Sequence, residues 1–170
     1  MHTLLNRFYQ ALMALACISM VAAFVSIMLG VAAREFAWNI QGLDAYAGYS
    51  IAAALFLALP ATLRQGDHIR VTLLVNRLGA KAANVLEYFC LVLASGIAVY
   101  FAWYVCRLVW VSYITHDVSP SADATALWIP QLSMALGCIG FAISFIHALV
   151  ARAAGVDFFV VSSGEMARTE

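Results

Sequence analysis

Charge is the scarcest property of this 170-residue chain. Only 11% of its residues are charged and 65% are apolar, against roughly 25% and 45–50% in an ordinary soluble domain. Nine basic residues balance nine acidic ones, so no net field would attract nucleic acid, and we expect no nucleic-acid partner. The scarcity of charge argues against a soluble domain and predicts a membrane protein.

Paired cysteines and paired histidines are also missing. A zinc site or a thiol oxidoreductase would need close cysteine pairs. A four-helix haem-binding electron carrier, the main alternative from another class, would need histidines paired across helices. Only His147 of the four histidines falls inside an apolar run, and the four cysteines form no C-x-x-C motif: Cys17, Cys90, Cys106 and Cys138. We therefore predict no enzyme activity and no cofactor or metal bound by this chain.

Long uncharged runs are what the chain does contain. The 26 residues between Arg7 and Arg34 carry no charge, and as a helix they would cover roughly 39 Å, more than the ~30 Å hydrocarbon core. A cleavable signal peptide is the competing interpretation, but its apolar region is typically about 7–15 residues. Three further runs follow. The predicted spans are about residues 8–33, 45–63, 84–106 and 124–151.

The distribution of basic and aromatic residues orients these spans. Seven of the nine basic residues fall at the termini or in the central connection, and only Arg34 and Arg107 fall on the other side. The positive-inside rule then places both termini in the cytoplasm. Aromatic residues gather on the opposite side, as in an interfacial belt: Trp38, Trp103, Tyr104, Trp110, Tyr113 and Trp128. We predict an all-α membrane protein whose four transmembrane helices form a single domain, residues 1–170.

The central connection contains the segment "LRQGDHIRVTLLVNRL", residues 63–78. Asp67 is suited to cap a helix start and Gly79 to end it. Between them, apolar residues recur 0, 3, 4 and 7 positions after Val71, ending at Leu78, while the arginines occupy another face of the helix. About 11 residues cannot cross a bilayer. The pattern predicts a short amphipathic helix, about 68–78, in the cytoplasmic interface.

Two kinds of candidate residue follow. Ionisable side chains in and before the interfacial helix are either membrane anchors or a partner interface: Arg64, Asp67, His68, Arg70 and Arg77. Small residues every four positions allow helices to pack closely where lipid removes the usual hydrophobic drive. The helix-packing candidates are Ala22, Ser26 and Gly30 in the first span and Gly140, Ser144 and Ala148 in the fourth.

The same segment resembles the signature between the second and third helices of the small membrane subunit of TRAP (tripartite ATP-independent periplasmic) transporters, the DctQ family. The family's typical form runs like R-x-G-x-H-I-R-V-D-L-L-x-D-R-L. Thr72 and Asn76 depart from it, because an acid is more usual at each position. The matched positions are Arg64, Gly66, His68, Ile69, Arg70, Val71, Leu73, Leu74, Arg77 and Leu78.

The resemblance implies an accessory scaffold in a three-part importer of the bacterial or archaeal cytoplasmic (inner) membrane. A periplasmic binding protein (DctP-type) would capture an organic anion of the carboxylate or sialic acid class. A large membrane subunit (DctM-type) would carry it inward with sodium, and sodium would bind that subunit. This chain would bind the large subunit and the lipid bilayer, with no active site of its own.

Overall fold

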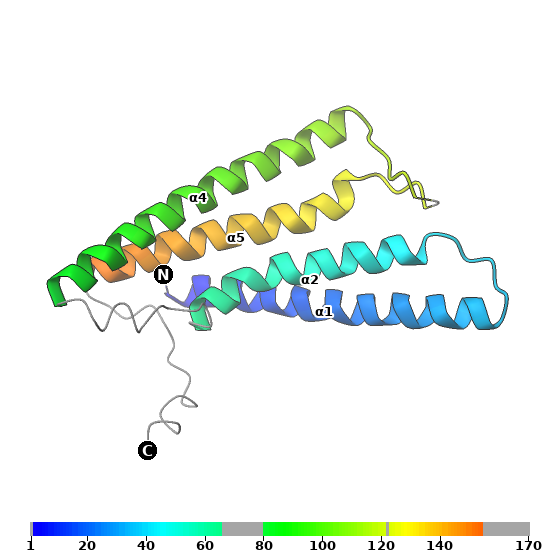
Figure 1. The fold of residues 1–170 in the computed structure, drawn as a ribbon, viewed down its shortest axis with the longest axis horizontal. Helices are drawn as coiled ribbons and strands as arrows, with labels where there is room; N and C mark the ends of the chain where they lie inside the picture. Colours follow the sequence, from blue (N-terminus) through cyan, green and yellow to red (C-terminus); the bar gives the residue numbers. More distant parts are fainter. Residues whose placement is uncertain (1, 66–79, 122, 155–170) are drawn as a thin grey trace, which may run out of the picture.

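The computed structural model describes residues 2–65, 80–121 and 123–154, and within these ranges the chain is helical and has no strand. Its helices are α1 (His2–Glu35), α2 (Leu43–Gln65), α4 (Ala80–Ile114) and α5 (Trp128–Ala153) (Figure 1). All four are long and apolar enough to cross a membrane. This confirms the predicted all-α class with four candidate spans. The interfacial helix predicted at 68–78 lies outside the described residues, and the orientation of the termini stays a prediction.

The helices form two antiparallel hairpins, α1–α2 and α4–α5, which lie side by side through α2 and α5 (Figure 1). The spatial order is therefore α1, α2, α5, α4, with α1 and α4 at the two edges. We call the end where α1 begins and α5 finishes the terminal end. The end with the connections 36–42 and 115–127 is the loop end.

Most helix boundaries lie outside the predicted spans, as at His2 in α1 and Ala80 in α4, and two boundaries at the loop end differ for local reasons. Helix α4 continues past residue 106 to Ile114, because Arg107 ends an uncharged run without interrupting helical hydrogen bonding. Helix α5 begins at Trp128 instead of near 124, because residues 117–127 fold back on themselves: the Ser119 amide donates to the Thr125 carbonyl at 2.8 Å. Pro130 lies in the first turn of α5, where its missing N–H leaves no intrahelical bond unmade.

Small residues dominate the core. The α4–α5 contact is built around Ala98, Ala102, Ala135, Cys138 and Ala142. Around the edges, large apolar side chains on every helix are exposed, which for a protein in water would be a severe aggregation hazard. In a bilayer the same side chains meet acyl chains, so the helices are held together by close packing and hydrogen bonds instead of by the exclusion of water.

Candidate functional site

Helices α2 and α5 approach each other closely at two glycines of α5. A Cβ atom placed on Gly137 would lie 2.5 Å from the carbonyl carbon of Phe56, and one on Gly140 would lie 2.7 Å from Leu12 Cδ1 and 2.9 Å from Pro60 Cγ. Pro60 is itself fully buried inside α2. Because only hydrogen fits at positions 137 and 140, these glycines determine how closely the two hairpins approach.

Gly140 of the fourth-span small-residue stripe lies at this contact. Gly140, Ser144 and Ala148 are all buried, and the Ser144 hydroxyl donates to the Gly140 carbonyl at 3.0 Å, so it needs no partner from another helix. Gly137 lies three residues before Gly140 and was not predicted, because a strict spacing of four residues skips position 137. Residues on one helix face are spaced by alternating steps of three and four, and that spacing includes Gly137.

The first-span stripe is divided in the structure. Gly30 is buried and lies near the Leu43 side chain, Ser26 is half-buried, and Ala22 is exposed on α1. Leu12 and Ala16 of α1 form a buried cluster with Ala53 and Leu57 of α2, and Ala23 and Ala33 of α1 are also buried. The four-residue spacing alone therefore does not follow the α1–α2 contact.

At the terminal end, Arg64 joins α2 to α1. Its guanidinium donates to the Asn6 side-chain carbonyl and lies 5.5 Å from the centroid of the Tyr9 ring. Tyr9 is buried, and its ring stacks on His147 of α5 with the two ring centroids 6.5 Å apart. Arg64 thus has partners within the protein, which the sequence pattern alone could not show. His147 takes part in packing at the bundle end.

Arg152 connects α5 to α4 at the same end. Its Nη2 atom lies 2.8 Å from Glu87 Oε2 and 2.5 Å from Asn84 Oδ1. The Tyr88 hydroxyl donates to the Arg152 carbonyl at 3.1 Å. The guanidinium also lies 6.0 Å from the Tyr88 ring centroid. This four-residue clamp binds the Nη2 atom of the side chain and a backbone carbonyl at the end of α5, where helix carbonyls lack intrahelical donors.

The remaining signature candidates lie outside the described residues. Asp67, His68, Arg70 and Arg77 belong to the segment 66–79. Its two flanks are the end of α2, held by Arg64, and the start of α4, held by the Arg152 clamp. Both flanks lie at the terminal end, and each is tied to a neighbouring helix.

At the loop end, the connection 115–127 docks on the start of α2. The Tyr49 hydroxyl lies 2.8 Å from Ser119 Oγ and 3.4 Å from Asp123 Oδ2. The hydrogen bond from the Thr125 side chain holds the pKa of the Asp123 carboxyl below its ordinary value, with a further hydrogen bond from Ser119, although burial acts in the opposite direction. Gly42 has φ +85°, and a Cβ there would lie 2.7 Å from Asp123 Cβ. Ser119 therefore serves to pack the loop against α2.

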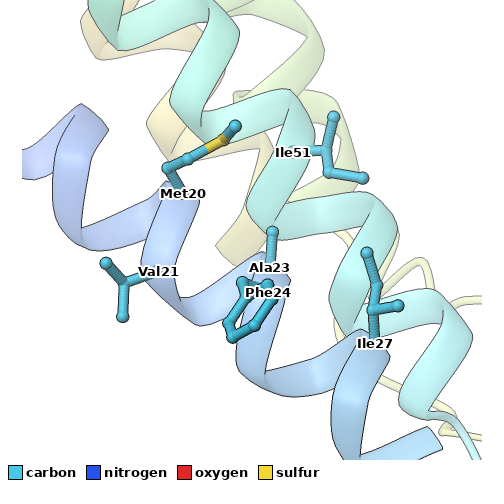
Figure 2. A pocket seen from close by; sticks show the side chains of 6 residues that line it. All are labelled: Met20, Val21, Ala23, Phe24, Ile27 and Ile51. Carbon is cyan, nitrogen blue, oxygen red and sulfur yellow. The ribbon is translucent and has the colours of Figure 1, made fainter. Parts of the chain in front are cut away.

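A shallow apolar groove of about 430 Å³ opens on the face shared by α1 and α2. Its lining side chains come from α1, with Ile51 from α2 (Figure 2). Polar surface is almost absent from the lining. Within the described ranges no three His, Cys, Asp or Glu side chains come together to hold a metal ion. His116 and His147 lie at opposite ends of the bundle, so these two cannot bind one haem iron.

Four apolar helices with Asp, Glu, Lys and Arg side chains confined to their two ends define an α-helical multi-pass membrane protein. The family model for tripartite ATP-independent periplasmic transporters, DctQ component, matches residues 23–155. The chain therefore belongs to the DctQ family and is a small membrane subunit of a TRAP transporter, a transporter component and not a member of an enzyme family. Comparison with curated proteins and with solved structures gives no match.

Proposed function

We propose that this chain is the stationary scaffold subunit of a sodium-coupled importer of an organic anion, a carboxylate or a sialic acid. It binds the large DctM-type subunit, which carries sodium and substrate, and supports uptake from a periplasmic DctP-type binding protein. It lies in the cytoplasmic membrane with both termini and the segment 66–79 in the cytoplasm. Family membership supports the transporter role, and the distribution of charge supports the scaffold role.

The observation that carries the scaffold role is the charge-free middle of each described helix. No charged residue falls between the first eight and the last eight positions of α1, α2, α4 or α5. All four helices are also continuous. A subunit that itself bound sodium or a carboxylate near the bilayer midplane would need intramembrane charge or broken helices there. The described charges instead clamp helix ends, as Arg64 and Arg152 do.

The signature residues give the proposal its most specific test. His68 and Arg70 are proposed to contact the large subunit from the cytoplasmic side. Replacing either by Ala is expected to weaken recovery of the large subunit and to lower uptake. The matched control is the double change Thr72→Asp and Asn76→Asp, which restores the more usual family residues and should leave both readouts unchanged.

The experiment is a mild-detergent affinity purification of the tagged chain from its native membrane, with mass spectrometry and an uptake assay. One large polytopic protein in fixed ratio, with uptake that collapses when the sodium gradient is removed, supports the proposal. A chain recovered alone and monodisperse would contradict it. Uptake that does not depend on the sodium gradient would contradict the proposed sodium coupling but would agree with the transporter role.

A further inference from the structure

Helix α4 has two faces of different character. One face packs on α5 through small side chains, among them Ser95, Ala98 and Ala102. The other face points away from the bundle, because α4 lies at the edge and its main helix contact is α5 (Figure 1). This outer face carries the surface on which the inference rests.

We define the α4 outer stripe as five exposed positions spaced by alternating steps of four and three residues: Gly96, Tyr100, Trp103, Arg107 and Trp110. Such spacing puts all five on one line along the helix. Tyr100, Trp103 and Trp110 are 64%, 70% and 64% exposed, and a Cβ on Gly96 would meet nothing within 4 Å. Within the described part of this subunit, the stripe is therefore uncovered.

The composition of the stripe is that of a protein interface. Trp, Tyr and Arg are the residue types enriched where binding energy concentrates, and a glycine at the end of the stripe lets another helix approach closely. The opposite edge of the bundle differs: α1 exposes Ile18, Val21, Val25 and Met28 at comparable positions. Phe24 on the same helix is also 64% exposed. Unlike the α4 outer stripe, this line of α1 carries no charged, tyrosine or tryptophan side chain.

Arg107 supplies the charge that a partner must complement. Among the described residues, the ion pairs are Arg34–Asp44 and Arg152–Glu87, so Arg107 has no acidic partner there. It follows Glu87 by 20 residues, which is roughly 30 Å of helix, about the thickness of the hydrocarbon core. Tyr100 and Gly96 lie roughly 10 Å and 16 Å deeper than Arg107. An interfacial aromatic belt accounts for Trp103 and Trp110 but not for the stripe's continuation into the core.

We propose that the α4 outer stripe is the surface on which a transmembrane helix of the large transporter subunit docks, with a carboxylate of that helix paired to Arg107. The proposal rests on the proposed function, because it assigns that function's partner to one face of this chain. Gly96 provides the close approach, Tyr100 and the two tryptophans provide the apolar contact, and the ion pair fixes the depth of one helix against the other.

Site-specific photocrosslinking in native membranes tests the stripe. A benzoylphenylalanine is introduced at position 103 or 110 of the full chain in the assembled transporter, and at position 18 or 25 of α1 as the exposed control. Crosslinks to the large subunit from α4 and not from α1 are expected. Crosslinks from α1 alone, from α4 to lipid alone, or from α4 to a second copy of this chain would each overturn the proposal.

A charge variant tests the ion pair separately. Arg107→Gln is expected to lower recovery of the large subunit at least about tenfold, since truncating one member of an interfacial charge pair leaves the other uncompensated. Arg107→Lys should restore most of it, and Arg34→Gln, which removes a charge at the same end of the bundle on α1, should change it little. Equal recovery for Arg107→Gln and Arg34→Gln would refute the pairing.

The outcomes also separate this inference from the function on which it rests. If the wild-type chain retains the large subunit but positions 103 and 110 do not crosslink to it, the proposed docking surface is wrong, while the proposed scaffold function is not contradicted. If the wild-type chain retains no large subunit, the proposed function fails and the stripe fails with it.

Discussion

Replacing Gly137 by Ala should separate the two hairpins. The new Cβ would lie 2.5 Å from the carbonyl carbon and 2.8 Å from the Cβ of Phe56, where van der Waals contact needs about 3.5–4.0 Å. The obstacle is largely backbone, so no side-chain rotation relieves it. Helix α5 must move away from α2 by about 1 Å, and contacts along the whole interface, including those of Gly140 with Pro60, must loosen.

The expected magnitude follows from two opposing effects. Overpacking of a well-packed site costs about 1–3 kcal/mol. Replacing a helical glycine by alanine returns about 0.5–1 kcal/mol, because the unfolded glycine loses more conformational freedom. Gly48→Ala in α2 isolates the second effect, since a Cβ on Gly48 would meet nothing within 4 Å. The difference in free energy of unfolding between the two variants should therefore be about 1–3 kcal/mol, with Gly137→Ala the less stable.

The assay is unfolding of the purified chain in mixed micelles by titration with sodium dodecyl sulfate, followed by tryptophan fluorescence. Gly48→Ala should unfold at an equal or slightly higher detergent fraction than the wild type. Gly137→Ala should unfold at a lower one. If the two variants agree within about 0.5 kcal/mol, the ordinary scatter for unimportant positions, then the two helices do not approach as closely as described.

Three further predictions concern the ends of the bundle. A double-mutant cycle of Arg152→Ala and Glu87→Ala in the same unfolding assay should give a coupling of about 0.2–1 kcal/mol, as for other partly exposed pairs; zero coupling would mean that the ion pair does not hold α5 to α4. Because the folded pKa of Asp123 is lowered, its carboxylate should stabilise the protein above about pH 4. The stability advantage of the wild type over Asp123→Asn should vanish as the pH falls through this lowered pKa. An advantage that persists at the acid limit would contradict the Thr125 hydrogen bond. Tyr9→Phe should change the free energy of unfolding by less than about 0.5 kcal/mol, because the Tyr9 hydroxyl has no hydrogen-bond partner among the described residues. Tyr9→Ala should cost about 3 kcal/mol or more, because it leaves a cavity. Similar losses in both variants would show that the hydroxyl is hydrogen-bonded.

Much of the architecture could be predicted because the bilayer imposes it. A helix that crosses lipid must satisfy its own backbone groups and remain apolar for about 20 residues, so the uncharged runs translate directly into α1, α2, α4 and α5. The boundaries were less accurate, as at Ile114 and Trp128, because hydropathy reports where charge begins and not where helical hydrogen bonding stops.

The candidate site was only partly accessible to sequence reasoning. Arg64 could be identified as one of a group of signature residues, but its partners Asn6 and Tyr9 lie more than 50 positions away along the chain. Tyr49 and Ser119 likewise meet at the loop end across 70 positions. No local spacing in the sequence predicts such pairs, because long-range contacts depend on the order in which the helices pack.

The sequence by itself determined that the protein spans a membrane, how many helices it offers for that purpose, and which transporter family its central segment resembles. Only the tertiary structure decided that α2 and α5 lie inside and α1 and α4 at the edges, that Gly137 and Gly140 set the approach of the hairpins, and that the α4 outer stripe is left uncovered. The physical reason is that lipid is as apolar as a helix surface. Apolar periodicity then no longer distinguishes the packed face of a helix from its exposed face, and shape, hydrogen bonds and paired charges make that choice.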